Sequence, residues 1–441
     1  MSTVTSRVLA ASAGRDRVSD AVKALALSLV IVGHSLAWTI TADGRVINTL
    51  DEAPWLFPVT WVVQILPLFF LLAGDRLRSL ARDPTADGAY RRLVRLVSPV
   101  LPLILITVVL AALISRLGPA PIAAAAGIIP VQIVWFLGVY LIAIAISPLL
   151  VRITRAWQFA ALLLAIAGVD LLRVAVNPAL GWANIVLVWS LFVALGMQLP
   201  RLRTLRPWLC AFGVLASVAV AIVLIVQGPY SAALITTTAL PGLTNLAPPT
   251  LVLASFGLAQ VFALMLAWPL LERGLARDRV WVPVALFASR AMGLYLLHLL
   301  FIALAIGVLL LATSGASALS GAWWLTHAIV LSVAVACAWA LAPPLTRAGA
   351  WLASALGHMA GHGGRHVLSR APVGAVLVLA ALGGVNLLLI SESGVGSIVE
   401  WRRVVAIPYL PVASIAMLLL IVGASACSAN SAGQHGRRQP P

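Results

Sequence analysis

Apolar stretches long enough to cross a lipid bilayer recur along the whole chain, and this feature limits its fold more than any other. The hydrocarbon core of a bilayer is about 30 Å thick, a distance that about 20 apolar residues cover as a helix. On this basis the sequence predicts twelve membrane spans, at residues 21–41, 59–73, 94–114, 128–150, 157–176, 182–199, 208–226, 251–271, 282–312, 323–342, 372–391 and 405–424. With 62% hydrophobic and only 10% charged residues, the chain has too little polar surface for a soluble enzyme. The sequence therefore predicts an all-α polytopic membrane protein.

The basic residues between these spans alternate from loop to loop. Of the 29 arginines and lysines, 23 lie in segments assigned to one side, and the loops on the other side are poor in them. Because basic residues accumulate in cytoplasmic loops, both termini are predicted to be cytoplasmic. This topology accounts for the net charge of +16, so the charge gives no support for nucleic-acid binding. A single lysine against 28 arginines, in a chain rich in Ala, Val, Leu and Gly, indicates a GC-rich bacterial genome and hence a bacterial cell membrane.

The spans and charges divide the chain into a membrane core and a C-terminal addition. The predicted parts are a cytoplasmic N-terminal segment (1–20), a ten-helix core (21–342), a cytoplasmic linker (343–371), a two-helix hairpin (372–424) and a disordered tail (425–441). The linker carries His358, His362 and His366, whose spacing would suit a metal site on a helix face. Three nearby glycines disfavour a helix, so we expect a solvated loop and no metal site.

The first span contains the most informative polar residues, Lys23 and His34. Eleven residues turn a helix through about 1,100°, so both side chains lie on nearly one face, roughly 16 Å apart along the axis. Ionisable groups within a span are costly and are candidates for function by default. The alternative is a lysine that extends to the membrane edge and a histidine that is hydrogen-bonded to another helix.

Two further histidines lie within predicted spans. Tyr295 and His298 are three residues apart, hence on one helix face, and we expect His298 to share a cavity with His34. Interhelical hydrogen bonds are the alternative explanation. His327 is near the outer end of its span and is expected to be an interfacial residue.

A cluster of arginines precedes the third span. Arg91 and Arg95 are four residues apart on one helix face, with Arg92 beside them, and such a cluster suits a polyphosphate at the membrane surface. A cytoplasmic cluster that merely sets the topology has the same composition.

Taken in order, several motifs over roughly residues 18–342 resemble those of the acyltransferase-3 family of bacterial membrane enzymes. The resemblance rests on Asp20-Ala-Val-Lys23 with His34, Leu66-Pro-Leu-Phe-Phe-Leu-Leu-Ala-Gly74, Arg91-Arg-Leu-Val-Arg95, Trp135-Phe-Leu137, Trp189-x-x-Phe192-x-x-x-Gly196, Thr244-Asn245 and Tyr295-Leu-Leu-His298. Lys23 stands where the family has arginine, which keeps the charge but loses the planar fork for two parallel hydrogen bonds. Ala73 stands where many members have serine.

The resemblance implies a membrane-bound acyltransferase. Its co-substrate would be cytoplasmic acyl-CoA, with no permanently bound cofactor, and an acyl group, expected to be acetyl, would pass to a hydroxyl of a carbohydrate or related acceptor. His34 would be the catalyst, as general base or as nucleophile. Lys23, Arg91, Arg92 and Arg95 would hold the donor's phosphates, and Tyr295, His298 and Asn245 would line the acceptor side. A secondary transporter and a catalytically inactive relative are the alternatives.

Overall fold

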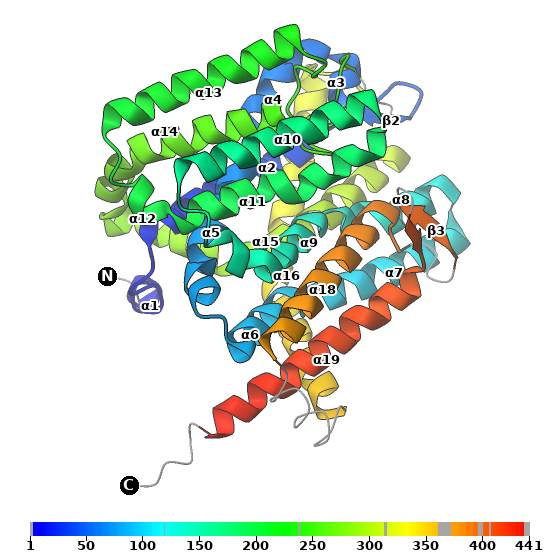
Figure 1. The fold of residues 1–441 in the computed structure, drawn as a ribbon. Coiled ribbons are helices and arrows are strands. Elements are labelled where there is room, and N and C mark those ends of the chain that lie inside the picture. Colours follow the sequence, from blue (N-terminus) through cyan, green and yellow to red (C-terminus); the bar gives the residue numbers. More distant parts are fainter. Residues whose placement is uncertain are drawn as a thin grey trace. The chain divides into compact units, whose positions relative to one another are not determined.

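The computed structural model describes residues 3–118, 120–236, 239–312, 315–359, 372–395, 400–404 and 407–435. Within these residues, eleven helices are long and apolar enough to cross a membrane. They overlap the first eleven of the twelve predicted spans. The protein is therefore a polytopic helical membrane protein (Figure 1).

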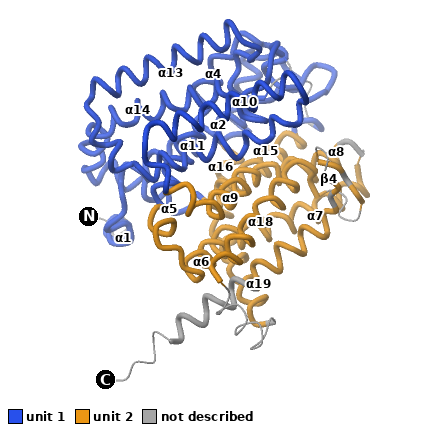
Figure 2. Tube along the Cα trace, in the orientation of Figure 1, with its two compact units in different colours: residues 1–76, 152–291, 309–331 blue, residues 77–151, 292–308, 332–441 orange. Residues whose placement is uncertain are grey.

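The chain forms two compact units, each built from several separate segments (Figure 2). Unit 1 comprises residues 1–76, 152–291 and 309–331. Its elements are α1 (Thr3–Ala11), α2 (Arg17–Leu36), β1 (Trp38–Ile40), β2 (Val46–Asn48), α3 (Thr49–Glu52), η1 (Pro54–Leu56), α4 (Phe57–Val63), α10 (Ala156–Ala175), η2 (Pro178–Ala183), α11 (Asn184–Met197), α12 (Leu199–Leu202), α13 (Pro207–Gln227) and α14 (Leu251–Leu275), with parts of α5 (Leu66–Arg82), α15 (Asp278–Ala312) and α16 (Gly321–Met359).

Unit 2 comprises residues 77–151, 292–308 and 332–441. It contains the remaining parts of α5, α15 and α16. Its other elements are α6 (Ala86–Val97), α7 (Val100–Leu117), α8 (Ala120–Gln132), α9 (Trp135–Leu150), α18 (Val373–Ser393), β3 (Arg402–Val404), β4 (Ile407–Tyr409) and α19 (Pro411–His435). Unit 2 thus contains segments from both sides of residue 342, where the predicted ten-helix core ends.

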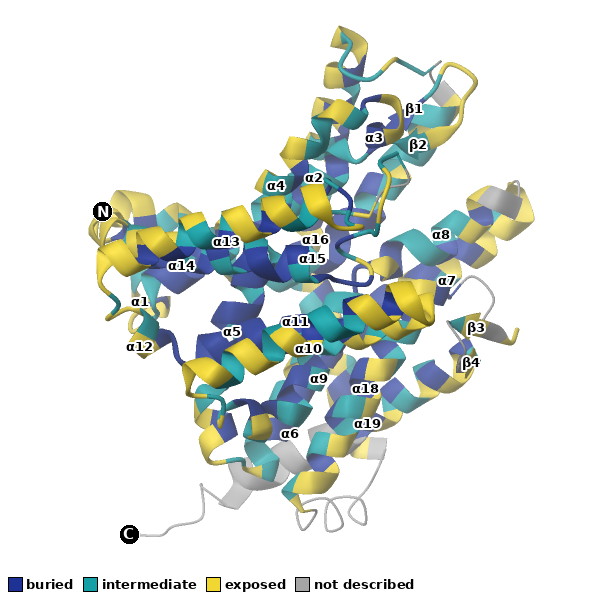
Figure 3. Cartoon of the chain, turned by 45° about the horizontal axis from the view of Figure 1, so that its top comes forward, coloured by how far each residue is buried: buried dark blue, intermediate teal, exposed yellow. Residues whose placement is uncertain are grey.

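The outer faces of the helices are apolar, as expected for surfaces that face lipid. On α13, one stripe of small residues is buried, and large apolar side chains on the other faces, such as Phe212, Leu215 and Val226, are exposed. Figure 3 shows the exposed residues along this helix, which packs against α14. A soluble protein rarely exposes so large an apolar surface.

Glycines allow two helices of unit 1 to pack with their backbones in contact. A Cβ at Gly74 of α5 would lie 2.0 Å from the Val193 carbonyl oxygen, and a Cβ at Gly196 of α11 would lie 1.8 Å from that of Leu71. No side chain fits in such a space. Gly74 and Gly196, which belong to the motifs quoted above, therefore allow α5 to pack directly against α11.

A similar contact joins the C-terminal region to the rest of unit 2. Gly138 of α9 and Gly384 of α18 face each other, and a Cβ on either would lie 2.6–2.7 Å from the other's carbonyl oxygen. Helix α18 follows the predicted ten-helix core in sequence, yet it packs closely on α9.

The structure differs from the sequence prediction at three helix ends. Helix α16 continues to Met359, although residues 343–371 were expected to form a linker, because Ala, Leu, Arg and Met, which favour a helix, make up most of residues 345–359 and outweigh Gly349 and Gly357. Helix α19 begins at 411, after the β3–β4 hairpin, and continues to His435, so the tail expected to be disordered from 425 is helical up to that residue; its alanines favour a helix. The described apolar part of α19, Pro411–Gly423, is shorter than a span, so a twelfth crossing is not established.

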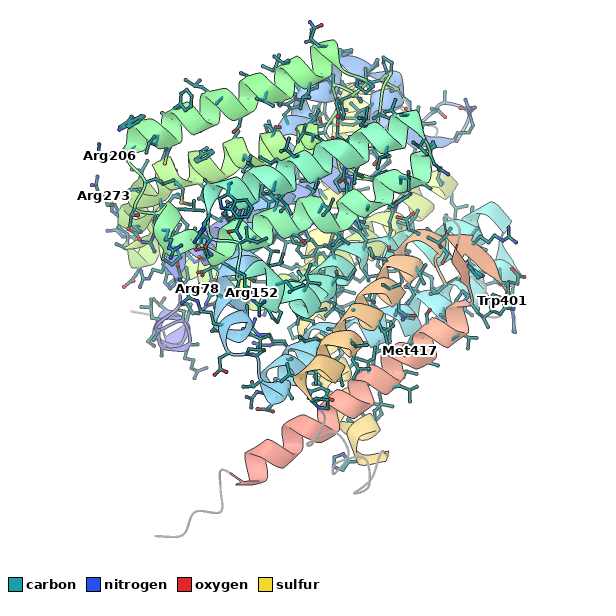
Figure 4. All side chains as sticks on the ribbon, in the orientation of Figure 1. Arg78, Arg152, Arg206, Arg273, Trp401 and Met417 are labelled. Carbon is teal, nitrogen blue, oxygen red and sulfur yellow. The ribbon has the colours of Figure 1, made fainter. Side chains whose placement is uncertain are left out.

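Arginines that were predicted to lie on one side of the membrane lie together at one end of unit 1. Arg17 at the start of α2 donates to the Leu275 carbonyl at the end of α14 (2.8 Å), and Arg203 pairs with Glu272 (2.5 Å). Arg206 and Arg273 lie at the same end of the α13–α14 pair (Figure 4). Segments that were predicted to share a side therefore do lie together at one end of this unit.

Candidate active site

Helix α2 carries both residues singled out in the first span. It runs without interruption from Arg17 to Leu36, and the Asp16 side chain caps it by accepting from the Ser19 amide (3.0 Å). Lys23 lies in its first third and His34 in its last turn, and both side chains are half-buried. The continuous helix on which the prediction depends is therefore confirmed, and regular helix geometry puts the cation and the imidazole on nearly one face, about 16 Å apart along the axis.

The charges around Lys23 are of both signs. Buried Asp20 accepts from Arg15 Nε (2.6 Å) and lies 3.9 Å from an Arg76 nitrogen. Asp16, Asp20 and Asp75 also lie close enough to Lys23 to attract its ammonium group. An anion bound at this end of α2 would have to compete with these carboxylates for the cations.

The arginine cluster lies on the amphipathic helix α6. Arg91 and Arg95 are exposed, Arg92 is half-buried, and Tyr90, Leu93 and Val97 form the buried face. Arg91 also forms an ion pair with Asp87, one turn earlier. The helix face predicted from the spacing is confirmed, and the phosphate-binding role stays a prediction.

Tyr295 and His298 lie together on α15, with ring centroids 6.5 Å apart. The Tyr295 hydroxyl donates to the Ile133 carbonyl (2.5 Å), and its ring meets the Phe136 ring edge-on at 5.8 Å. His298 is fully buried, with Nδ1 3.1 Å from the Leu294 carbonyl oxygen. Both residues belong to unit 2 and His34 to unit 1, so the cavity predicted to join the histidines stays a prediction.

Asn245 is part of the loop of residues 228–250, which links α13 to α14. Its amide nitrogen donates to the carbonyls of Ser231 (2.7 Å) and Ala233 (2.8 Å), and its carbonyl accepts from the Thr250 hydroxyl (2.6 Å). The side chain is fully buried. Its hydrogen bonds hold the loop in shape, and the substrate-binding role predicted for it stays a prediction.

A buried carboxylate on α10, which the sequence analysis did not single out, fixes the two ends of this loop. Asp170 is 2% exposed and accepts from Asn184 Nδ2 (2.9 Å), the Tyr230 hydroxyl (3.0 Å) and the Leu251 amide (2.8 Å). Burial and the neighbouring Asp170 carboxylate raise the pKa of the Tyr230 hydroxyl above its ordinary value. The signal in the sequence was an aspartate within an apolar span, three residues before an arginine, Arg173.

His327 is buried rather than interfacial. It is 2% exposed and stacks between the rings of Trp323 (3.8 Å between centroids) and Trp38 (4.5 Å). Its two ring nitrogens lie 2.7 and 2.8 Å from the carbonyl oxygens of Trp323 and Trp38. The β1–β2 hairpin covers this position, which sequence alone did not indicate.

The described residues contain no group of three His, Cys, Asp or Glu side chains that could hold a metal ion. His358 lies on α16, where its Nδ1 is 2.6 Å from the Ser354 carbonyl oxygen. His362 and His366 lie outside the described residues.

Comparison with known proteins gives one match. No curated protein and no solved structure matches the chain. A family model described as an acyltransferase domain matches residues 17–343, from the first residue of α2 to the middle of α16. The match contains α2, the arginine cluster, Asn245 and the Tyr295–His298 pair. The chain therefore belongs to the acyltransferase-3 family.

Proposed function

We propose that the protein transfers an acyl group, expected to be acetyl, from cytoplasmic acyl-CoA to a hydroxyl of a carbohydrate or related acceptor. The family supports a membrane acyltransferase in general. The observation that carries the finer proposal is α2, an uninterrupted helix with Lys23 near one end and His34 near the other. Acyl-CoA has phosphates at one end and a thioester at the other, so its two ends match the two residues.

In the simplest route, His34 acts as a general base. Its imidazole takes the proton from the acceptor hydroxyl, and the oxygen attacks the thioester carbonyl carbon. A carbon–oxygen bond forms, the carbon–sulfur bond breaks, and the CoA thiolate leaves and takes the proton. As a nucleophile, the imidazole would instead carry the acyl group before the hydroxyl accepts it. Only the second route leaves an acylated His34 when the acceptor is withheld.

At the donor side, Lys23 and the arginines Arg91, Arg92 and Arg95 would bind the phosphates of CoA. Charge-assisted hydrogen bonds to phosphate are stronger than neutral ones. The carboxylates beside Lys23 and the Arg91–Asp87 ion pair would keep these cations in place when no donor is bound. Tyr295 and His298 are proposed to line the acceptor side, and Asn245 to act through the loop that it holds.

Comparison of surface glycans from deletion and wild-type cells by mass spectrometry tests this function. We expect an acyl substituent on a glycan or glycoside of wild-type cells, absent from the deletion strain and restored by the wild-type gene. A His34→Ala gene should not restore it, and His358→Ala, which changes an exposed histidine outside the family match, should restore it. Identical acylation of wild-type and deletion cells would contradict the proposal.

A further inference from the structure

The second membrane span is interrupted in its middle. Helix α4 ends at Val63 and α5 begins at Leu66, with Pro67 as its second residue. Proline has no amide hydrogen, and its ring clashes with the carbonyl group one turn earlier, so it favours a kink or a break in the helix at this position. Gln64 and Ile65 form the break, and Gln64 is 2% exposed. Non-helical backbone at membrane depth occurs where protein covers it or where it lines a cavity.

Two glutamine side chains satisfy the backbone at this break. Gln260 of α14 donates from Nε2 to the Gln64 carbonyl (2.6 Å), and Gln64 donates from its own Nε2 to the Leu234 carbonyl (3.1 Å). The neighbouring Thr60 hydroxyl accepts from the Leu234 amide (3.0 Å). Residues 232–234 of the loop thus lie along the end of α4, inside unit 1.

These hydrogen bonds leave one buried acceptor, Gln260 Oε1, without a donor among the described residues. The partner of Gln260 Nε2 is a carbonyl, which only accepts hydrogen bonds, so the orientation of the amide is fixed. Its other atom, Oε1, is buried, and no described residue donates to it. A buried acceptor of this kind normally has a partner, and an O–H or N–H group from outside the described residues would supply one here.

The break lies at the level of His34. A Cβ on Gly33 would be 3.4 Å from Val63 Cβ, so α2 and α4 touch at this pair. His34 and Gln64 are the next residues along the two helices. Chain geometry then places their Cα atoms within roughly 14 Å of each other. Helix α14, which carries Gln260, also packs against α2.

We propose that Gln260, held in place by the break at Gln64, binds a hydroxyl group of the acceptor. Its Oε1 accepts a hydrogen bond from one O–H of a polyol or sugar, while a second hydroxyl of the same molecule reaches His34. This inference rests on the proposed acyl transfer and adds a residue for the recognition of the acceptor. A purely structural role, in which Gln260 only closes the gap left by Pro67, is the alternative that the tests must separate.

The first test measures how the acetyl group is divided between two acceptors, glycerol and water. Purified protein receives acetyl-CoA in the presence of glycerol, and the ratio of acetylated glycerol to free acetate is measured. Once the acetate formed without enzyme is subtracted, this ratio does not depend on how much of the enzyme is folded. We expect Gln260→Met to lower the ratio about tenfold, the effect of one lost hydrogen bond. Methionine keeps the length and flexibility of the side chain.

The control is Gln198→Met, because Gln198 is another buried glutamine of unit 1 whose Nε2 donates to a backbone carbonyl, that of Ile153 (3.3 Å). It should leave the ratio unchanged. An unchanged ratio in Gln260→Met, or an equal fall in both variants, would overturn the proposal.

The second test does not require acyl transfer. In a chain whose native cysteines are replaced by alanine, Gln260→Cys is treated with a small water-soluble methanethiosulfonate. We expect labelling, and we expect glycerol to slow it, because the proposed site admits polyols from water. Absence of labelling would mean that water and small solutes do not reach the break, and the proposal would be wrong. If the wild type does not use acetyl-CoA at all, the proposed function fails and this labelling alone decides the question.

Discussion

Replacement of Asp170 by asparagine should destabilise the protein strongly, although the two side chains have almost the same size. The carboxylate accepts hydrogen bonds from Asn184, Tyr230 and the Leu251 amide, all within 3.0 Å. Asparagine has one accepting oxygen and presents an NH₂ group to at least one of these donors. Because Asn184 bonds one carboxylate oxygen and Tyr230 and the Leu251 amide bond the other, either Asn184 or the Tyr230–Leu251 pair then loses its acceptor at residue 170. Removal of one member of such a buried charged network costs about 3–5 kcal/mol.

Unfolding in mixed detergent micelles, followed by tryptophan fluorescence, measures this loss. Tyr230→Phe should cost less, about 1.5–3 kcal/mol, because it removes one hydrogen bond to a charged group and leaves two. The double variant should cost less than the sum of the two, since the residues share one bond. Asp43→Asn, at an exposed carboxylate of the β1–β2 hairpin, serves as a control and should change little. A stability of Asp170→Asn equal to that of the control would refute the reasoning.

The Asp170–Tyr230 pair also predicts that the stability of the protein depends on pH. The pKa of Tyr230 is raised by burial and by Asp170, so the folded protein holds this proton more tightly than the unfolded chain. The stability that Tyr230 contributes is therefore fully present below about pH 10, the ordinary tyrosine value, and decreases as the pH rises above it. The difference in stability between wild type and Tyr230→Phe should shrink over that alkaline range. A constant difference would show that the hydroxyl does not hold its proton in this way.

Three further predictions concern packing, donor binding and topology. Gly196→Val should destabilise the protein by about 1–3 kcal/mol or more, because its Cβ would lie 1.8 Å from a carbonyl oxygen of α5; normal unfolding of this variant would contradict the close contact. Calorimetry should show weaker CoA binding when Arg91 and Arg92 are both changed to Gln, and unchanged or tighter binding for Lys23→Arg, which restores the planar fork; equal binding by wild type and the double variant would leave the cluster with a topological role only. With native cysteines replaced, Ala360→Cys should resist an impermeant thiol reagent in intact cells, and efficient labelling would reverse the predicted topology.

Hydropathy and loop charge predicted most of the helices because a bilayer imposes a minimum apolar length on every span. Eleven of the twelve predicted spans correspond to long helices, and the arginines assigned to one side of unit 1 lie together. The helix ends were harder to predict. The alanines and leucines of α16 favour a helix despite Gly349 and Gly357, so the helix extends to Met359 into a segment expected to be a loop.

The polar residues of the site were only partly predictable. Periodicity placed Lys23 and His34 on one face of α2, because that depends on the helix alone. The role of Asp170 depends on the two ends of the loop that it holds, and that of Gln260 depends on its contact with Gln64, a residue 196 positions away. His327 was misjudged for the same reason, since the hairpin that buries it comes from the other end of the chain. Contacts of this range leave no periodic pattern in the sequence.

The catalytic role of His34 is the central claim, and acyl transfer by the purified His34→Ala variant tests it most directly. The variant is compared with wild type and with His358→Ala, using acetyl-CoA and an acceptor identified from the cell glycans, at equal amounts of folded protein. We expect His34→Ala to lose on the order of a hundredfold in rate or more, as happens when general-base catalysis is removed, while His358→Ala keeps the wild-type rate. A well-folded His34→Ala protein that transfers the acyl group at a near-normal rate would remove His34 from the mechanism.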